Sequence, residues 1–328
     1  PRAPMSAQAA AKKGDIAALR AAVERDGSPD LTRLLGTTLA WATETKASRF
    51  GDVATYLLDM GADPGARGAM GMPMLCLAAR SGVARLVDLL HERGAPETFY
   101  TAAALGAVDA VRRELNVRPA TAKAQDENGM TALVYCAQSA LGRSDGAVET
   151  RLADIAGLLI DWGADAEAAP ESYLRPLSVA AGHSGNLPLV ELLLDRAANP
   201  PDEGPLYEAL RTMRRQGDRY SRICDVLLRH GEYDLAPILL GAARHEDVQA
   251  TTWLLARGAD PSLRVEDGRT TLHLAADRNS GVRVVGLLLD HGADMNARDD
   301  LGQTPLHYAR QSEKGKIVDF LVARGATE

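Results

Sequence analysis

The feature that most constrains this chain is an internal repeat of 33 or 34 residues. Two C-terminal segments that begin at Asp267 and Asp300 align with each other, and their Gly-Ala pairs at Gly292 and Gly325 are 33 residues apart. The same ending, in which a leucine pair precedes Gly-Ala, recurs at Gly61, Gly94, Gly163 and Gly258, with degenerate copies at Ala197 and Gly231. The steps from 61 to 94, 163 to 197, 197 to 231 and 258 to 292 are 33, 34, 34 and 34. A period of this size predicts stacked units that bury each other's apolar faces.

A helix-start motif recurs within these repeats. It reads "GQTPLHYA" from Gly302, "GRTTLHLAA" from Gly268 and "GMTALVYCA" from Gly129, with weaker copies in "LRPLSVAA" and "MLCLAA". Threonine can cap the free N–H groups of a helix start, and proline fits the first helical position. The apolar runs "VVGLLLD" and "LVELLLD" predict a second helix with one inner face, and the glycine that follows predicts a left-handed cap.

This pattern resembles the ankyrin-repeat family over essentially the whole chain. The resemblance implies an all-α fold, an ankyrin-repeat solenoid of about ten helix-turn-helix units with hairpin-like fingers. It also implies that His273 and His307, in the "Leu-His" position, form hydrogen bonds that tie neighbouring repeats. We expect residues 7–328 to form a single continuous domain, after an expression remnant and disordered start at residues 1–6.

Composition narrows the class of protein. The chain is 46% apolar and only 4% aromatic, which favours small-residue helix packing over a β-sandwich or barrel. Its net charge of −7 argues against a nucleic-acid partner, because phosphate contacts need a basic face. Cys76, Cys136 and Cys224 form no C-x-x-C pair, so we expect a reducing compartment. Without a signal-peptide pattern or a membrane-spanning apolar run, the chain is expected to be cytoplasmic, away from membranes, and monomeric.

Function in such an array is expected where the repeat is irregular. The fingers before repeats four, seven and eight are short, which predicts notches in the groove wall. Repeat five carries an insertion, Ser139–Arg151, whose polar sequence predicts a loop. Repeat seven carries "RTMRRQGDRYSR" (Arg211–Arg222), which is expected to be an overlong first helix and a loop that offset the short finger.

The five arginines of this stretch allow three interpretations. They could form a solvated helix face with local salt bridges, a patch that recognises anions or, with least support, a contact for nucleic acid. Arginine and tyrosine are enriched at binding hot spots, and arginine can bind a carboxylate through two hydrogen bonds. Tyr100 and Tyr207 are assigned to the position of the family's histidine, beside short fingers. The predicted partner-binding residues are Tyr100, Tyr135, Tyr173, Tyr207, Arg211, Arg214, Arg215, Arg219 and Tyr220.

No motif for enzyme chemistry is found. The sequence has no G-x-S-x-G, no H-E-x-x-H and no phosphate-binding loop. His183 and His245 have no third ligand at a fixed spacing, so no zinc site is expected. We therefore predict no catalytic residues, no metal and no cofactor.

The resemblance implies a non-catalytic module that binds a protein or peptide on the concave groove of the solenoid. Repeats four to seven are the expected contact region, and the arginines favour an acidic segment of the partner. Two alternatives stay open. One is an inhibitor or immunity-type protein that occludes a toxin or enzyme, and the other is an unusual enzyme with its active site in the central notch.

Overall fold

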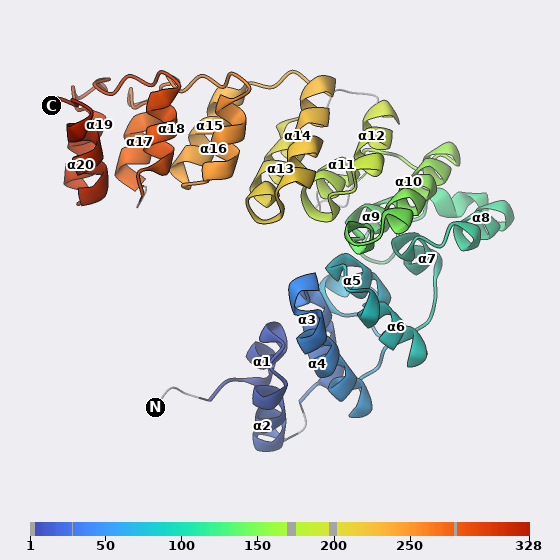
Figure 1. The fold of residues 1–328 in the computed structure, drawn as a ribbon. Coiled ribbons are helices and arrows are strands. Elements are labelled where there is room, and N and C mark those ends of the chain that lie inside the picture. Colours follow the sequence, from blue (N-terminus) through green and yellow to red (C-terminus); the bar gives the residue numbers. More distant parts are fainter. Residues whose placement is uncertain (1–3, 28, 169–174, 197–201, 279–280) are drawn as a thin grey trace. The chain divides into compact units, whose positions relative to one another are not determined.

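The structure, a computed structural model, describes residues 4–27, 29–168, 175–196, 202–278 and 281–328. Twenty α-helices occupy this part of the chain as ten consecutive helix pairs (Figure 1). The prediction of an all-α array of about ten helix-turn-helix repeats is therefore confirmed. Internal contacts divide the chain into an N-terminal unit, residues 1–201, and a C-terminal unit, residues 202–328. That residues 7–328 form a single continuous domain stays a prediction.

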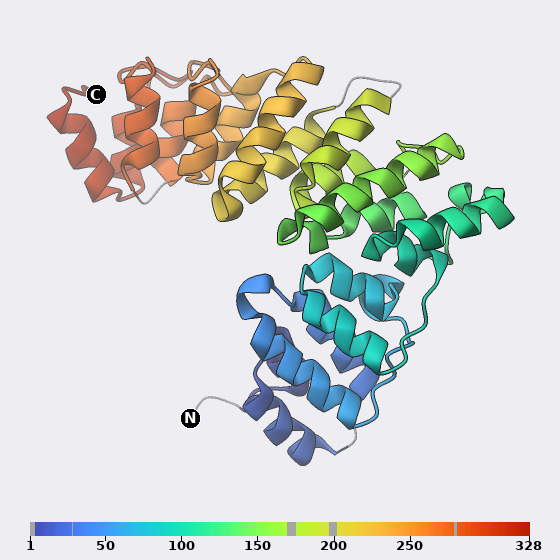
Figure 2. The ribbon, with the colours of Figure 1, turned by 45° about the vertical axis from the view of Figure 1, so that its right-hand side comes forward.

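Six helix pairs belong to the N-terminal unit and four to the C-terminal unit (Figure 2). The N-terminal pairs are α1 (Ala7–Lys13) and α2 (Ile16–Asp26), α3 (Leu31–Trp41) and α4 (Ala47–Asp59), α5 (Met74–Ser81) and α6 (Ala84–Glu92), α7 (Phe99–Leu105) and α8 (Val108–Val117), α9 (Ala132–Gln138) and α10 (Gly146–Asp161), and α11 (Pro176–Val179) and α12 (Leu187–Arg196). The C-terminal pairs are α13 (Glu203–Gln216) and α14 (Asp218–His230), α15 (Leu235–Arg244) and α16 (Val248–Leu255), α17 (Thr271–Arg278) and α18 (Arg283–Asp290), and α19 (Pro305–Gln311) and α20 (Gly315–Ala323).

Caps explain where many of these helices begin and end. The Thr304 hydroxyl accepts the N–H of His307 at 3.4 Å, and Pro305 takes the first position of α19. Gly82 and Gly106 end α5 and α7 in the left-handed conformation. These caps satisfy backbone groups that a helix end leaves unpaired, as the sequence pattern predicts.

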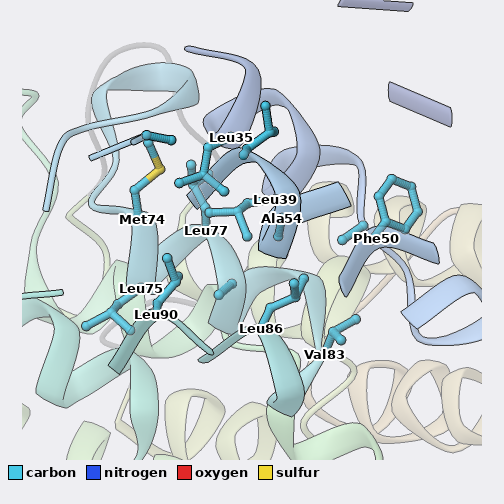
Figure 3. Close-up of a cluster of buried hydrophobic side chains, with 14 of the residues drawn as sticks. Leu35, Leu39, Phe50, Ala54, Met74, Leu75, Leu77, Val83, Leu86 and Leu90 are labelled. Carbon is cyan, nitrogen blue, oxygen red and sulfur yellow. The ribbon is translucent and has the colours of Figure 1, made fainter. Parts of the chain in front are cut away.

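The core of the N-terminal unit is made largely of leucine, alanine and valine side chains. Leu35 and Leu39 of α3 belong to one buried cluster with Leu77 of α5 and Leu86 of α6 (Figure 3). All four are at most 1% exposed. Because this surface lies between successive repeats, no single repeat can bury it alone, and stacking stabilises the array.

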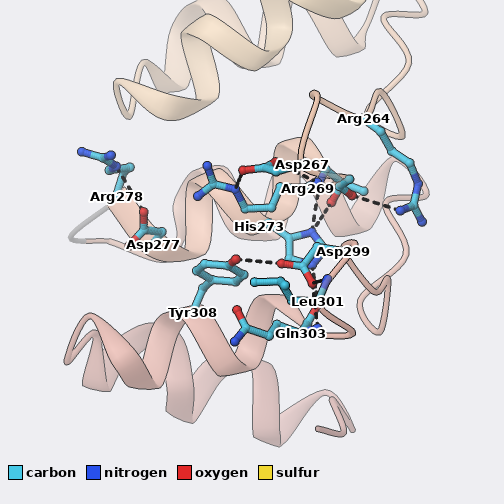
Figure 4. Close-up of polar contacts among 12 residues, drawn as sticks. Arg264, Asp267, Arg269, His273, Asp277, Arg278, Asp299, Leu301, Gln303 and Tyr308 are labelled. Carbon is cyan, nitrogen blue, oxygen red and sulfur yellow. Dashed lines mark hydrogen bonds and ion pairs between the residues drawn. The ribbon is translucent and has the colours of Figure 1, made fainter.

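His273, in the first helix of repeat nine, joins two successive fingers, the one that precedes repeat nine and the one that precedes repeat ten. Nδ1 of His273 accepts the N–H of Thr270 at 3.1 Å, and Nε2 donates to the Gln303 carbonyl at 3.0 Å (Figure 4). The Gln303 N–H donates to Asp299 Oδ1 at 2.7 Å, and Tyr308 Oη donates to Asp299 Oδ2 at 2.7 Å. Burial lowers the pKa of His273, which favours the neutral ring. The expected tie between repeats is confirmed at His273.

In the N-terminal unit, fingers meet across repeat four. Arg67 Nη1, from the finger of repeat three, donates to Asp126 Oδ2 of repeat five at 3.1 Å. Asn128 Nδ2 donates to the Gly71 carbonyl at 3.0 Å. The fingers of repeats three and five thus bridge the notch that the short finger of repeat four predicts.

The loops within the helix pairs of this unit meet as well. The Ala140 N–H donates to the Ala79 carbonyl at 3.0 Å, which joins repeat five to repeat three. His183 Nε2 donates to the Arg80 carbonyl at 3.0 Å, and the Arg143 guanidinium donates to the His183 carbonyl. Repeats three, five and six therefore contact one another, although repeat four lies between them in sequence.

The prediction that Ser139–Arg151 is a loop is wrong for its second half. The Asp145 side chain accepts the N–H groups of Ala147 and Val148, and α10 begins at Gly146. The insertion therefore lengthens α10, because an effective N-cap precedes a segment that can continue as helix.

The loop predicted within Arg211–Arg222 is also wrong. Only Gly217 separates α13 from α14, with φ 62° and ψ −134°, a conformation that glycine adopts without a Cβ penalty. The extra length of repeat seven therefore lies in two long helices, which carry the arginines on rigid backbone.

Candidate interaction surface

The first helix of repeat seven, α13, packs differently from those that follow it. In the later repeats, α15 packs against α17 and α17 against α19, first helix on first helix. By contrast, α13 packs against α14 of its own repeat and against α16, the second helix of the next repeat. A hollow opens between α13 and α15.

This first hollow has a volume of about 580 Å³. Tyr207, Arg211 and Arg214 line it from α13, and Ile238, Gly241 and His245 line it from the side of α15. A Cβ atom built on Gly241 would meet nothing within 4 Å, so the helix surface is open at this position. The hollow thus combines apolar walls with basic side chains.

Arg214 is the cation that remains available there. Arg211 Nη2 lies 2.6 Å from Glu208 Oε2, so its charge is already matched. Arg214 is exposed and forms no ion pair with any residue that the structure describes. Asp247 also lines the hollow, but its carboxylate accepts the N–H of Ala250 as a helix cap at 3.1 Å. The hollow therefore presents a free guanidinium, which suits an anionic ligand.

A second hollow, of about 410 Å³, lies between α15, α17 and the finger of repeat nine. Arg269 and Arg278 line it but are paired, Arg269 Nε with Asp267 Oδ2 at 2.6 Å and Arg278 with Asp277 at 3.2 Å. Arg244 also lines it, is exposed, and has no ion pair within the described part of the chain. Glu266 adds an exposed carboxylate to the same wall.

The structure brings together three of the predicted site residues. Tyr207, 53% exposed, lies with Arg211 and Arg214 at the first hollow. Tyr220 is wrongly predicted, because it is fully buried within α14, and Arg219 lies on α14, outside the set that lines the hollow. Tyr173 and the side chain of Arg215 lie outside the described residues.

Tyr135 is also wrongly predicted as a contact residue. It is 1% exposed, and its Oη donates to Asp126 Oδ2 at 2.7 Å. Burial alone would raise the pKa of Asp126, but hydrogen bonds from Tyr135 and from the N–H groups of Met130 and Asn128 outweigh it and lower that pKa. The same arrangement joins Tyr308 to Asp299, so Tyr135 is a structural residue of its finger.

Tyr100 does not occupy the position assigned to it. The N–H of Thr98 donates to Thr101 Oγ1 at 2.6 Å, as the N–H of Thr270 donates to His273 Nδ1 in repeat nine. Thr101 therefore takes the histidine position, and Tyr100, half-buried, packs on Tyr135 with ring centroids 5.7 Å apart. The assignment fails by one residue because Thr98 directly precedes two aromatic residues instead of Pro-Leu.

Sequence reasoning missed Gly241, Arg244 and His245 as members of the surface. The sequence suggests only metal binding as a role for His245, and it marks neither Gly241 nor Arg244. The available signal was their spacing: Gly241 and His245 are four residues apart and share one helix face, next to Arg244 on the adjoining face.

Burial raises the pKa of all three cysteine thiols, so they stay protonated and poorly nucleophilic. Within the described ranges, no cluster of three or more His, Cys, Asp or Glu side chains could hold a metal ion. In the same ranges, none of the helices has the length and hydropathy to cross a membrane.

Comparison with known proteins agrees with the geometry. The family model for ankyrin repeats in three copies matches residues 239–327. No curated protein matches the chain. The matched segment includes α16 to α20 and most of α15, and it contains the His273 tie. Residues 239–327 are therefore similar to ankyrin repeats, and repeats of this kind generally mediate protein–protein interaction.

Proposed function

We propose that this chain is a non-catalytic binding module that takes an acidic segment of a protein partner on the first-helix face of its C-terminal unit. This face consists of α13, α15 and α17 with the two hollows between them. The proposal moves the expected contact region from repeats four to seven toward repeats seven to nine. The free guanidinium of Arg214 at a preformed, partly apolar hollow is the observation that carries it.

The chemistry of the face supports a protein ligand. Apolar walls from Leu210, Ile238 and Ala242 can bury an uncharged part of the ligand, while Arg214 and Tyr207 offer the side-chain types that dominate binding energy at interfaces. Both hollows lie between helices, so they are formed before binding and little ordering is required.

Gly241 provides a direct test. Gly241→Phe places a ring in the first hollow, and Gly241→Ala is the matched control, because neither Cβ atom meets anything within 4 Å. A partner is first recovered by affinity purification with mass spectrometry, and its binding to both variants is measured by isothermal titration calorimetry. We expect Gly241→Phe to weaken binding by about tenfold or more, as for loss of a hot-spot contact. Gly241→Ala should bind as the parent chain does.

Thermal unfolding of both variants controls for folding, since replacement of a helical glycine by alanine stabilises by roughly 0.4–1 kcal/mol. Unchanged affinity of a correctly folded Gly241→Phe variant would contradict the proposed surface.

A further inference from the structure

One side of α15 differs from the equivalent side of α17 in how it is covered by the described part of the chain. The helix α17 packs against α15, and Leu272, Ala275 and Ala276 of α17 are each 0% exposed. The equivalent residues of α15, one repeat step of 34 earlier, are Ile238, Gly241 and Ala242. Gly241 and Ala242 are only half-buried, because the preceding first helix, α13, packs against α16 instead. The first hollow therefore lies on the side of α15 where a preceding first helix would pack in a regular array.

Both long walls of this hollow are single faces of helices. The residues that line it from α13 and from α15 follow the same spacing, i, i+3, i+4 and i+7, and are Tyr207, Leu210, Arg211 and Arg214, and Ile238, Gly241, Ala242 and His245. Residues with this spacing share one side of a helix. Seven residues rise about 10 Å along a helix axis, so each wall is about two turns long.

The chemistry of the walls favours a helix as the ligand. Gly241 and Ala242 are as small as the equivalent residues of α17, and small residues at the contact let helix axes approach closely. Leu210 and Ile238 are apolar and cannot pair with backbone N–H or C=O groups of a ligand. A helix satisfies these groups within its own backbone, whereas an extended segment would bury them unpaired or need a free strand edge. The described walls are helices and offer no such edge.

We infer that the first hollow takes an amphipathic α-helix of a protein partner, with its apolar side on α15 and an acidic side chain toward Arg214. The charge follows from Arg214, which is exposed and forms no ion pair with the described residues, whereas Arg211 is already matched by Glu208. Tyr207, 53% exposed, adds an aromatic surface at the same hollow. The inference rests on the proposed function and specifies its ligand.

A cysteine placed at Gly241 tests this inference by disulfide capture. Burial raises the pKa of the thiols of Cys76, Cys136 and Cys224, so Gly241→Cys supplies the reactive thiol of the full chain. Gly315→Cys is the matched control, because Gly315 is also a helical glycine at which a Cβ atom would meet nothing within 4 Å.

The probes are alanine- and lysine-based peptides of about 17 residues, long enough to form a helix alone. Each has a central cysteine, leucines four residues to either side, and one glutamate. The glutamate lies three or seven residues from the cysteine, on the same helix face, or two or five residues away, on the opposite face. Control peptides have glutamine for the glutamate, or a proline two residues before the cysteine. The peptides exchange with the chain in reduced and oxidised mercaptoethanol, and intact-mass spectrometry measures the linked fraction.

The helical peptides should have an exchange equilibrium constant at Gly241→Cys about tenfold or more above that of the proline peptide, because an interior proline breaks the helix. At least one glutamate on the cysteine face should raise the constant by about two- to fivefold over its glutamine version, the range of an exposed ion pair. Adding Arg214→Gln should abolish this gain. Glutamates on the opposite face should have no effect, and Gly315→Cys should favour none of the peptides.

Equal capture of the helical and proline peptides at Gly241→Cys would assign the hollow to an extended segment and overturn the inference, as would the same helical preference at Gly315→Cys. Disulfide-linked dimers of Gly241→Cys in place of peptide capture would assign it to a second copy of the chain. A helical preference that no glutamate changes would contradict the acidic side chain. In each case, loss of the natural partner in Gly241→Phe would leave the proposed function standing, whereas retention of that partner would remove the function itself.

Discussion

Replacement of Tyr135 by phenylalanine tests whether this residue is structural. The change removes only the hydroxyl, whose hydrogen bond to Asp126 is 2.7 Å long and partly buried. A hydrogen bond to a charged group contributes about 1.5–3 kcal/mol, so the free energy of unfolding should fall by that amount. For a unit of about 200 residues, each kcal/mol corresponds to about 2–4 °C in Tm.

The pH dependence of this loss follows from Asp126. Its pKa in the folded chain is lowered, so the stability it contributes is present above its unfolded pKa of about 3.9 and is lost as pH falls through the folded pKa. Without the tyrosine hydroxyl, the folded pKa rises toward its ordinary value. The difference between parent and variant should therefore be largest at pH 7 and shrink at about pH 3 and below.

Urea denaturation followed by circular dichroism measures both effects, with the slope m expected to stay constant. Tyr207→Phe is the matched control, because Tyr207 is 53% exposed and its loss should change stability by less than about 0.5 kcal/mol. A loss below about 0.5 kcal/mol in Tyr135→Phe, or an equal loss at both pH values, would refute the structural role.

Three other substitutions test the remaining arguments. Leu288→Ala, at a fully buried position of α18, should cost about 2–5 kcal/mol in urea denaturation, and a loss under about 1 kcal/mol would contradict its place in the core. Charge reversal of Arg214 and Arg215 to glutamate should weaken partner binding in a calorimetric titration and leave Tm nearly unchanged; unchanged binding would remove the arginines from the surface. Burial lowers the pKa of His273, so its contribution is present above the unfolded pKa of about 6.5 and is lost as pH falls. His273→Thr should flatten the decline in stability between pH 7 and pH 5, and an unchanged slope would assign that decline to other groups.

The repeat step, the helix pairs and the His273 tie could all be predicted from sequence. Each depends on signals within one period, such as a threonine cap, a Leu-Leu run or a glycine after a helix. The register at α7 was mispredicted because a threonine can accept the same N–H as the family's histidine, and tyrosine resembles histidine more closely in type. Local chemistry, not residue similarity, decides that position.

The candidate site was only half predictable. Tyr207, Arg211 and Arg214 stood out by composition, but the hollow exists because α13 packs on α16, and no local pattern encodes that choice. The wrong predictions for Tyr135 and Tyr220 have the same cause. Their burial depends on neighbours in space, while their residue type alone suggested an exposed contact.

The contacts across repeat four also affect how this chain should unfold. Stability in a regular repeat array is a sum over adjacent repeats, so end repeats can fray one at a time. Here Arg67 contacts Asp126 and Arg80 contacts His183, at sequence separations of 59 and 103 residues. Removing any of repeats three, five or six breaks contacts with the two others, so the folding energy includes coupling between second and third neighbours. Repeats three to six should consequently exchange their core amide hydrogens as a single cooperative block.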